Sequence, residues 1–149
     1  MATKTLSFAA ALMLVMPGLS SANPPADPER ARFEACGSAQ RITCVVDGDT
    51  FWYAGAKIRI ADINTPETSR PACPEEAALG DLAKRRLAQM LNEGPFTLEV
   101  RGRETDRYGR ALRVVTRRGE SLGARLEAEG LAEHWKGRRG DWCGGSGGT

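Results

Sequence analysis

The 149-residue sequence predicts one α+β domain, mostly β, in which short strands form a small barrel and two or so helices pack on it. Five short segments with strand character occupy residues 42–46, 50–53, 57–63, 96–101 and 111–116. A longer segment, residues 74–91, has apolar side chains at helical spacing and separates the third strand from the fourth. Mostly antiparallel short strands, with one helix inserted and another following, are typical of a small barrel.

The first three strands are predicted from local patterns. Asp47 and Gly48 lie between the first two strands, and Asp-Gly is a strong hairpin signal. In the third strand, Ile58 and Ile60 fall on one face and Arg59 on the other, because successive side chains of a strand alternate between faces.

The second half of the chain contains the helices and the last two strands. The apolar positions that define the long helix are Leu79, Leu82, Ala83, Leu87, Met90 and Leu91. An arginine-rich turn joins the last two strands. Ser121 can cap a short second helix that ends at Gly130.

Composition divides the chain into four regions. They are a signal peptide (residues 1–22), a flexible leader (23–35), a folded domain (36–143) and a disordered tail (144–149). The signal peptide is predicted from Lys4, an apolar run too short to span a membrane, and small residues at a cleavage site before Asn23. The leader is rich in proline and polar residues, and the tail consists of glycine, serine and threonine.

Charge alone does not identify a partner. The formal net charge is only +2, but residues 101–118 contain seven arginines against Glu104 and Asp106. Local clusters of positive charge bind phosphate. A solvated hairpin face explains the same composition equally well.

Four cysteines in a short exported chain predict two disulfides. Cys36, Cys44, Cys73 and Cys143 lack the paired close spacing of a zinc site, and His134 is the only histidine. Of the three possible connectivities we favour Cys36–Cys44, which are close in sequence, together with Cys73–Cys143. The second bridge would tie the end of the chain to the loop that follows Glu67.

Three short motifs supply the parts needed to cut a phosphodiester. They are VVDGDT (residues 45–50), RIADINTPE (59–67) and TDRYGR (105–110). The first two offer acidic and carbonyl oxygens, which suit a hard cation. Arg59 and Arg110 each present a planar fork of donors to phosphate, and the Glu67 carboxylate can orient or deprotonate a water.

The order, spacing and identity of these motifs resemble the staphylococcal (thermonuclease-like) nuclease family, over residues 41–132. The resemblance implies a five-stranded OB-fold barrel. It implies catalytic roles for Arg59, Glu67 and Arg110. It also implies that Arg107 and Tyr108 contact the terminal phosphate of the substrate.

The resemblance implies a calcium site as well. Its ligands would be the Asp49 carboxylate, the Asn64 side chain and the Thr65 backbone carbonyl. The family usually has Asp where Asn64 stands, and an amide oxygen can coordinate calcium but brings no charge. We therefore expect weaker calcium binding than in a site with Asp, and we expect Asn64→Asp to lower the calcium concentration that cleavage requires.

Each of these signals also has a purely structural explanation. Asp-Gly is a turn signal, Asn64 and Glu67 have the spacing of a helix capping box, and a strand arginine such as Arg59 is commonly solvated or ion-paired. The single histidine, His134, is expected on the surface and excludes mechanisms that need two histidines. Tryptophans can stack on bases, but packing within the protein is their more common use.

The sequence therefore predicts an exported, calcium-dependent endonuclease that hydrolyses phosphodiester bonds of DNA and RNA with weak sequence preference. Single-stranded or fraying substrate, a monomer, a periplasmic or secreted location and no membrane association after signal cleavage are also expected. The alternative is a non-catalytic OB-fold module that binds single-stranded nucleic acid. The presence of Arg59, Glu67 and Arg110 together favours the enzyme.

Overall fold

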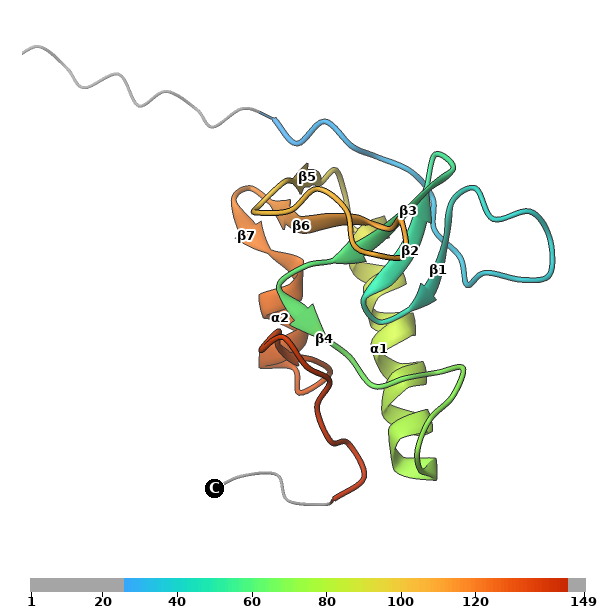
Figure 1. The fold of residues 1–149 in the computed structure, drawn as a ribbon. Helices are drawn as coiled ribbons and strands as arrows, with labels where there is room; N and C mark the ends of the chain where they lie inside the picture. The colour runs from blue at the N-terminus through green and yellow to red at the C-terminus, as the bar shows by residue number, and fades with distance from the viewer. Residues whose placement is uncertain (1–25, 145–149) are drawn as a thin grey trace, which may run out of the picture.

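The structure of the protein is a computed structural model that describes residues 26–144 (Figure 1). Its strands are β1 (Cys44–Asp47), β2 (Thr50–Tyr53), β3 (Ala56–Ile60), β4 (Ile63–Asn64), β5 (Thr97–Glu99), β6 (Ala111–Arg117), β7 (Glu120–Ser121) and β8 (Glu133–His134). Its helices are α1 (Pro74–Asn92) and α2 (Leu122–Ala128). The predicted signal peptide and residues 145–149 of the predicted tail lie outside the described residues.

The main sheet has the strand order β1-β2-β3-β6-β5, and β7 pairs with β6 beside this path. Only the β3–β6 pair is parallel among these strands; the other pairs are antiparallel. In the chain, helix α1 follows β4 and precedes β5. This arrangement confirms the predicted OB-fold class. The two-residue strands β4 and β8, which form a separate ladder, are not apparent from the sequence.

Both predicted helices form with nearly the predicted limits. Pro74 occupies the start of α1, after the N-cap residue Cys73, where a missing backbone N–H costs nothing. Ser121 caps α2 by accepting a hydrogen bond from the Ala124 backbone N–H at 3.1 Å. One detail is corrected: the Leu82 side chain is 47% exposed and does not join the core.

The segment before β1 closes the barrel, so the prediction of a flexible leader over residues 23–35 is wrong for residues 26–35. Glu29 exchanges two backbone hydrogen bonds of 2.9 Å with Phe96, just before β5. Ala35 forms a parallel bridge with Val45 of β1. The segment therefore lies between the two end strands of the five-strand path. Its polar composition conceals one anchor, Phe33, which is only 2% exposed.

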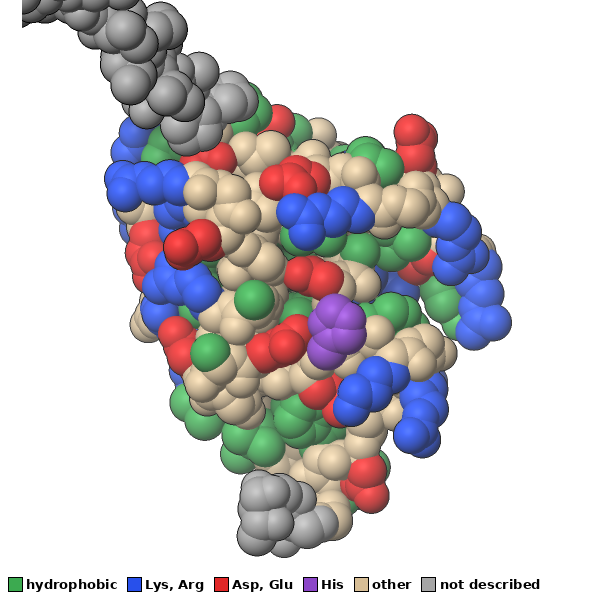
Figure 2. All heavy atoms as spheres, turned by 90° about the vertical axis from the view of Figure 1, so that its left-hand side faces the viewer, with side chains coloured by type: hydrophobic (Ala, Val, Ile, Leu, Met, Phe, Trp, Pro, Cys, Tyr) green, Lys and Arg blue, Asp and Glu red, His purple; other side chains and the backbone are tan. Residues whose placement is uncertain are grey.

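The surface seen from the side of α2 carries charges of both signs. Figure 2 shows carboxylates directly beside the single histidine and lysine or arginine side chains farther out toward the edges of this face. His134 lies on β8 and its side chain is 68% exposed, as expected. The face is therefore not a continuous basic stripe.

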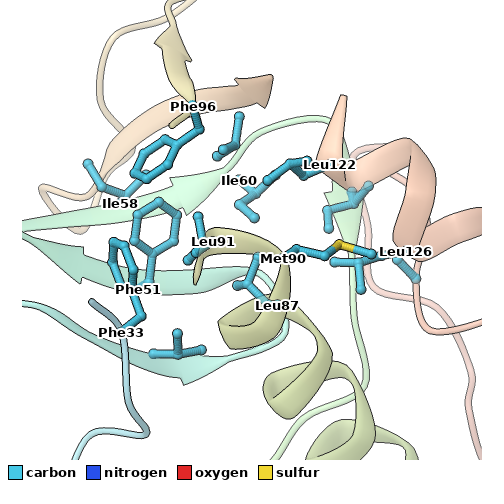
Figure 3. Packing of buried hydrophobic residues seen from close by; sticks show 14 residues of the cluster. Phe33, Phe51, Ile58, Ile60, Leu87, Met90, Leu91, Phe96, Leu122 and Leu126 are labelled. Carbon is cyan, nitrogen blue, oxygen red and sulfur yellow. The ribbon is translucent and has the colours of Figure 1, made fainter. Parts of the chain in front are cut away.

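The hydrophobic core lies between the sheet, α1 and α2. Figure 3 shows side chains from α1 pointing toward aromatic and aliphatic residues of the strands. The labelled members are Phe33, Phe51, Ile58, Ile60, Leu87, Met90, Leu91, Phe96, Leu122 and Leu126. The Phe33 ring lies with its centroid 5.7 Å from that of Phe51 and 5.9 Å from that of Phe96, so the leader contributes directly to this core.

Two disulfides cross-link the described part of the chain. They are Cys36–Cys44 and Cys73–Cys143, the pairing favoured from the sequence. The first fastens the leader to the start of β1, and the second fastens the C-terminal segment to the N-cap residue of α1. Within residues 26–144, neither helix is long and apolar enough to cross a membrane.

Closure of the barrel by the leader leads to a stability prediction. We expect Phe33→Ala to lower the free energy of unfolding by about 3–5 kcal/mol, because it removes a buried aromatic ring that packs against three others. Urea unfolding with both disulfides intact measures this loss. The control is Arg32→Ala, whose side chain is 87% exposed and which should change the free energy by less than about 0.5 kcal/mol. Equal, small effects of the two substitutions would contradict the packing of the leader.

Candidate active site

The β1–β2 turn holds Asp49 in a buried position. The Asp49 carboxylate accepts a hydrogen bond from Thr50 Oγ1 at Oδ1 (2.8 Å) and one from the Thr65 backbone N–H at Oδ2 (3.3 Å). A Cβ at Gly48 would lie 2.6 Å from the Cβ of Ala83 in α1, so only glycine lets the helix pack against the turn. Asp49 thus links the hairpin to the segment after β4, which an ordinary Asp-Gly turn does not require.

Arg59, on β3, is bound within the protein from several sides. Its Nη2 lies 3.0 Å from Asp49 Oδ2, and its Nη1 donates to the backbone carbonyls of Ile60 and Ile63, the latter at 2.9 Å. The guanidinium carbon lies 5.5 Å from the ring centroid of Trp135. Arg59 is 9% exposed and ion-paired, which was the structural alternative considered for it. These contacts hold its planar fork in one orientation beside Asp49.

Asn64 and Thr65 lie at the end of β4 and are both 3% exposed. Asn64 Nδ2 donates to Glu133 Oε1 at 3.2 Å, across the β4–β8 ladder. Asn64 and Glu67 do not form a capping box, because α1 begins only at Pro74 and has Cys73 as its N-cap. That structural explanation of the motif is therefore wrong.

Negative charge is concentrated at the turn next to these residues. Burial and repulsion from the Asp49 carboxylate raise the pKa of Asp47 to about 7, and Glu67 acts in the same direction. Asp49 and Glu67 thus both act on Asp47 electrostatically. A cation bound beside them would offset this repulsion.

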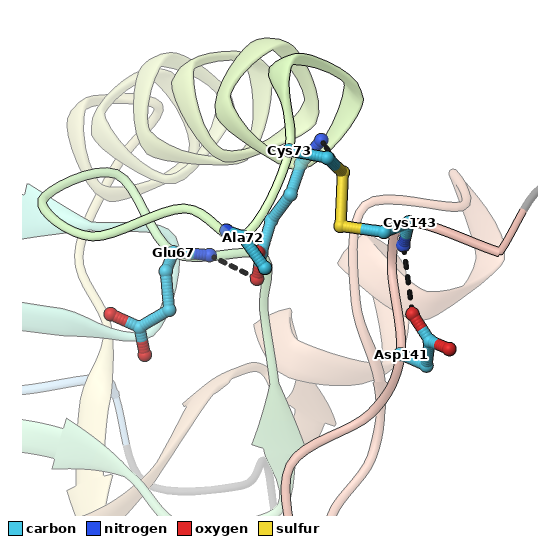
Figure 4. The surroundings of a disulfide bond; sticks show 6 residues. Glu67, Ala72, Cys73, Asp141 and Cys143 are labelled. Carbon is cyan, nitrogen blue, oxygen red and sulfur yellow. Dashed lines mark hydrogen bonds between the residues drawn. A yellow bond between two sulfur atoms is a disulfide. The ribbon is translucent and has the colours of Figure 1, made fainter.

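The backbone of Glu67 is fixed against the start of α1. Its N–H donates to Glu76 Oε1 at 3.2 Å, and Glu76 Oε2 accepts from the Ala72 N–H at 2.6 Å. A Cβ at Gly80 would lie 2.9 Å from the Glu67 carbonyl oxygen, so the helix and this loop are in close contact. Figure 4 shows the Glu67 side chain pointing away from α1, with its carboxylate directed to the opposite side of the loop.

The C-terminal segment lies over this loop. Arg139 Nη2 is 2.9 Å from Glu67 Oε1, although the Arg139 side chain is 71% exposed. The Cys73–Cys143 disulfide holds the end of the same segment beside the loop (Figure 4). Exposed ion pairs of this kind contribute only about 0–1 kcal/mol. A substrate phosphate can therefore displace the guanidinium from Glu67.

Arg110 belongs to a tight loop that Asp106 organises. Asp106 Oδ1 accepts from the backbone N–H groups of Tyr108 (2.9 Å) and Arg110 (3.0 Å). Its Oδ2 lies 2.6 Å from Arg110 Nε. Gly109 has a φ of 75°, which favours glycine at this point of the loop. The side chain of Arg110 is therefore oriented by the loop from which it projects.

The aromatic ring of Tyr108 lies between two arginines and is 68% exposed. The guanidinium carbons of Arg107 and Arg110 lie 4.8 Å and 5.5 Å from its ring centroid. Within residues 26–144, no hydrogen bond or ion pair joins this loop to Asp49 or Glu67. Direct contacts thus join Asp49, Arg59 and Thr65 in one set and Arg107, Tyr108 and Arg110 in another.

The oxygens predicted to bind calcium fit a hard cation. In the described part of the chain, no group of three or more His, Cys, Asp or Glu residues is arranged to hold a metal. The donors predicted from the resemblance are one carboxylate, from Asp49, with the neutral oxygens of the Asn64 amide and the Thr65 carbonyl. An all-oxygen set completed by water suits calcium, whereas zinc prefers nitrogen and sulfur donors.

Sequence reasoning missed four residues that position the site: Glu76, Asp106, Glu133 and Arg139. Asp106 carries a detectable signal, because an Asp three residues before a Gly is typical of a turn that bonds its own backbone. Glu133 and Arg139 carry none. Their contacts depend on the short β4–β8 ladder and on a disulfide that joins residues 70 positions apart.

Comparisons with known proteins agree with this fold and these motifs. Residues 57–141, more than half of the chain, match the family of staphylococcal nuclease homologues. The matched region contains the second and third motifs, RIADINTPE and TDRYGR. The fold and the motifs thus define a nuclease-type OB-fold protein, and the chain belongs to the staphylococcal nuclease homologue family.

Two curated relatives from Bacillus subtilis (strain 168) are similar to the chain over 93 residues. Endonuclease YncB is 38% identical, and the aligned part covers 58% of this chain and 43% of that protein. The SPbeta prophage-derived endonuclease YokF is 39% identical, with 58% of this chain and 31% of that protein covered. The chain therefore spans less than half the length of these relatives.

The Asp106 loop leads to a prediction about pH. Burial raises the pKa of Asp106, but hydrogen bonds from the Arg110 backbone and guanidinium outweigh it, so the pKa lies below its ordinary value. The stability contributed by this carboxylate is present above the unfolded pKa of about 3.9 and is lost as pH falls through the lower folded pKa. We expect Asp106→Asn to cost about 1–3 kcal/mol at pH 7 and much less near pH 2.

Urea unfolding of both proteins across this pH range measures the difference. The control is Glu104→Gln, an exposed carboxylate on the same loop, which should have little effect at either pH. A loss at pH 7 that persists unchanged at pH 2 would show that ionisation of Asp106 does not stabilise the loop.

Proposed function

We propose that this chain is a calcium-dependent endonuclease that hydrolyses phosphodiester bonds of DNA and RNA with weak sequence preference. The observation that carries the proposal is the placement of Glu67. Its backbone is fixed against α1, and its carboxylate points away from that helix, in a chain that belongs to a nuclease family. The similarity to two endonucleases supports the same reaction class.

Glu67 would act as the general base. It would orient a water for in-line attack on phosphorus and accept the proton that the water loses. The contact with Arg139 uses only one of its carboxylate oxygens, Oε1. The other oxygen remains for the water, and the rigid backbone keeps the carboxylate at a constant distance from α1.

The two arginines would stabilise the charge that develops on the phosphate. Asp106 binds Arg110 through Nε, and within residues 26–144 the terminal nitrogens of Arg110 make no hydrogen bond, so they can bind phosphate. Arg59 is already fixed beside Asp49. Donors that are oriented before the reaction lower the barrier most effectively, because they need not reorganise as charge develops.

Calcium, when bound, would supply a Lewis acid that neutralises a phosphate oxygen. Asp49, Asn64 and the Thr65 carbonyl are the residues that would hold it. The exposed Tyr108 ring between two arginines offers stacking and positive charge together, a combination that binds single strands with little sequence preference. We therefore propose that single-stranded or fraying nucleic acid is the preferred substrate.

The experiment is a cleavage assay on the mature protein, with plasmid, denatured DNA and RNA as substrates and with either calcium or a chelator. We expect degradation of all three substrates in calcium, fastest for denatured DNA and RNA, and none in chelator. Full activity in excess chelator would overturn the role of calcium. Binding without cleavage would identify a nucleic-acid-binding module instead.

Two substitutions test the mechanism. We expect Glu67→Gln and Arg110→Ala each to lower the cleavage rate by about a hundredfold or more, because they remove a positioned base and an electrostatic donor. Charge-matched controls are Glu75→Gln and Arg103→Ala, both on exposed side chains. If Arg110→Ala retains the wild-type rate, Arg110 does not bind the reacting phosphate.

We also propose that the protein is exported and monomeric, in the periplasm or the medium. The support is the signal-like start of the sequence and the presence of two disulfides, which persist in oxidising compartments. Intact mass measurement of the protein expressed with its own N-terminal region tests export. The expected product begins at Asn23 and lacks four hydrogens because both disulfides have formed. A full-length, reduced product would contradict export.

A further inference from the structure

We propose that Glu133 is a positioning residue for the calcium site, fixing the Asn64 amide so that its oxygen, not its nitrogen, faces the cation. This inference rests on the calcium dependence proposed above. Glu133 lies directly opposite Asn64 in the β4–β8 ladder. Asn64 Nδ2 donates to Glu133 Oε1 at 3.2 Å, and Asn64 is 3% exposed.

The chemistry of the two side chains determines the orientation. An ionised carboxylate only accepts hydrogen bonds, whereas an amide has a donor end and an acceptor end. Only the NH₂ end of Asn64 can therefore face Glu133. The oxygen Oδ1 lies on the other side of the planar amide, and it is the atom that calcium can bind. An apolar group at position 133, or one that can both donate and accept hydrogen bonds, would not impose this orientation on the Asn64 amide.

Glu133 is itself held by the C-terminal segment. A Cβ atom at residue 140 would overlap the Glu133 carboxylate, so the backbone at Gly140 lies directly against it. The Cys73–Cys143 disulfide holds the same C-terminal segment three residues later. The backbone pairing of β4 with β8 fixes the other end of the side chain. Both Asn64 and Gly140 thus restrict the position of the carboxylate.

This arrangement supplies the negative charge that an aspartate at position 64 would otherwise bring. The charge of Glu133 would not touch the cation, because the neutral side chain of Asn64 would lie between them. It changes what Asn64→Asp should do, because that substitution places two carboxylates at hydrogen-bond distance, where they repel each other unless one of them takes up a proton. The benefit expected from the sequence alone therefore depends on the residue at position 133.

Four proteins test the inference: wild type, Glu133→Gln, Asn64→Asp and the double variant. Titration calorimetry measures the calcium dissociation constant, and thermal unfolding in chelator measures the stability of the metal-free protein. We expect Glu133→Gln to weaken calcium binding by about 10–100-fold, the usual effect of removing a residue that orients a metal ligand. Asn64→Asp should lower the unfolding temperature in chelator when Glu133 is present.

The double variant gives the most specific result. Its amide at position 133 can donate a hydrogen bond to its carboxylate at position 64, so the pair is restored with its polarity reversed. We expect the double variant to recover the unfolding temperature of the wild type and to bind calcium at least as tightly. The control is Glu127→Gln. The Glu127 carboxylate lies 3.5 Å from Nδ1 of His134, the residue that follows Glu133, so this substitution removes a negative charge from the same region. It should leave calcium binding unchanged.

The outcomes separate this inference from the proposed function. Unchanged calcium binding in Glu133→Gln, or equal effects of Asn64→Asp in the wild-type and Glu133→Gln backgrounds, would overturn the inference alone if the wild type still cleaves DNA in calcium. A wild-type protein that neither binds calcium nor needs it for cleavage would overturn both. If Glu127→Gln weakened calcium binding as much as Glu133→Gln does, the effect would be one of general surface charge. That result would overturn the positioning role of Glu133.

Discussion

The candidate site depends on the buried ion pair between Arg59 and Asp49. Burying a charge costs several kcal/mol unless a partner compensates it, and removing either partner leaves the other uncompensated. Here the guanidinium also binds the backbone carbonyl of Ile63 and lies beside the ring of Trp135. The β1–β2 turn, the β3–β4 connection and the residue after β8 must therefore be in place together. A single arginine thus couples the assembly of the barrel to the assembly of the site.

The two ends of the described chain complete what the central barrel leaves open. The leader lies between β1 and the start of β5, and the Cys36–Cys44 bridge fastens it there. The C-terminal segment lies over the Glu67 loop, and the Cys73–Cys143 bridge fastens it. Disulfides typically stabilise by about 2–4 kcal/mol through the unfolded state. In this protein the second bridge also holds the segment that carries Arg139 and Gly140 beside the site.

Local patterns predicted the parts of the fold that local forces determine. The hairpin at Asp47-Gly48, the limits of α1 and the Ser121 cap each depend on a few neighbouring residues. The leader was misjudged because one buried aromatic, Phe33, outweighs a polar and proline-rich composition. The ladder between β4 and β8 was missed because two-residue strands have no periodicity to detect. At the site, motifs identified candidate residues, but their partners come from segments whose approach only tertiary structure reveals.

The position of Asn64 shows why a ligand set cannot be evaluated one residue at a time. Taken alone, Asn64 offers an amide oxygen without the charge of a carboxylate, which predicts weak calcium binding. In the ladder it stands opposite Glu133, and the pair together has the charge of one carboxylate and an oxygen with a fixed direction. A strand pairing holds its two residues opposite each other whatever their side chains are. The carboxylate of such a pair can therefore stand on either strand while the backbone stays in place. Because cation binding depends on both the charge of the site and the direction of its oxygens, the relevant unit is the pair and not the single position.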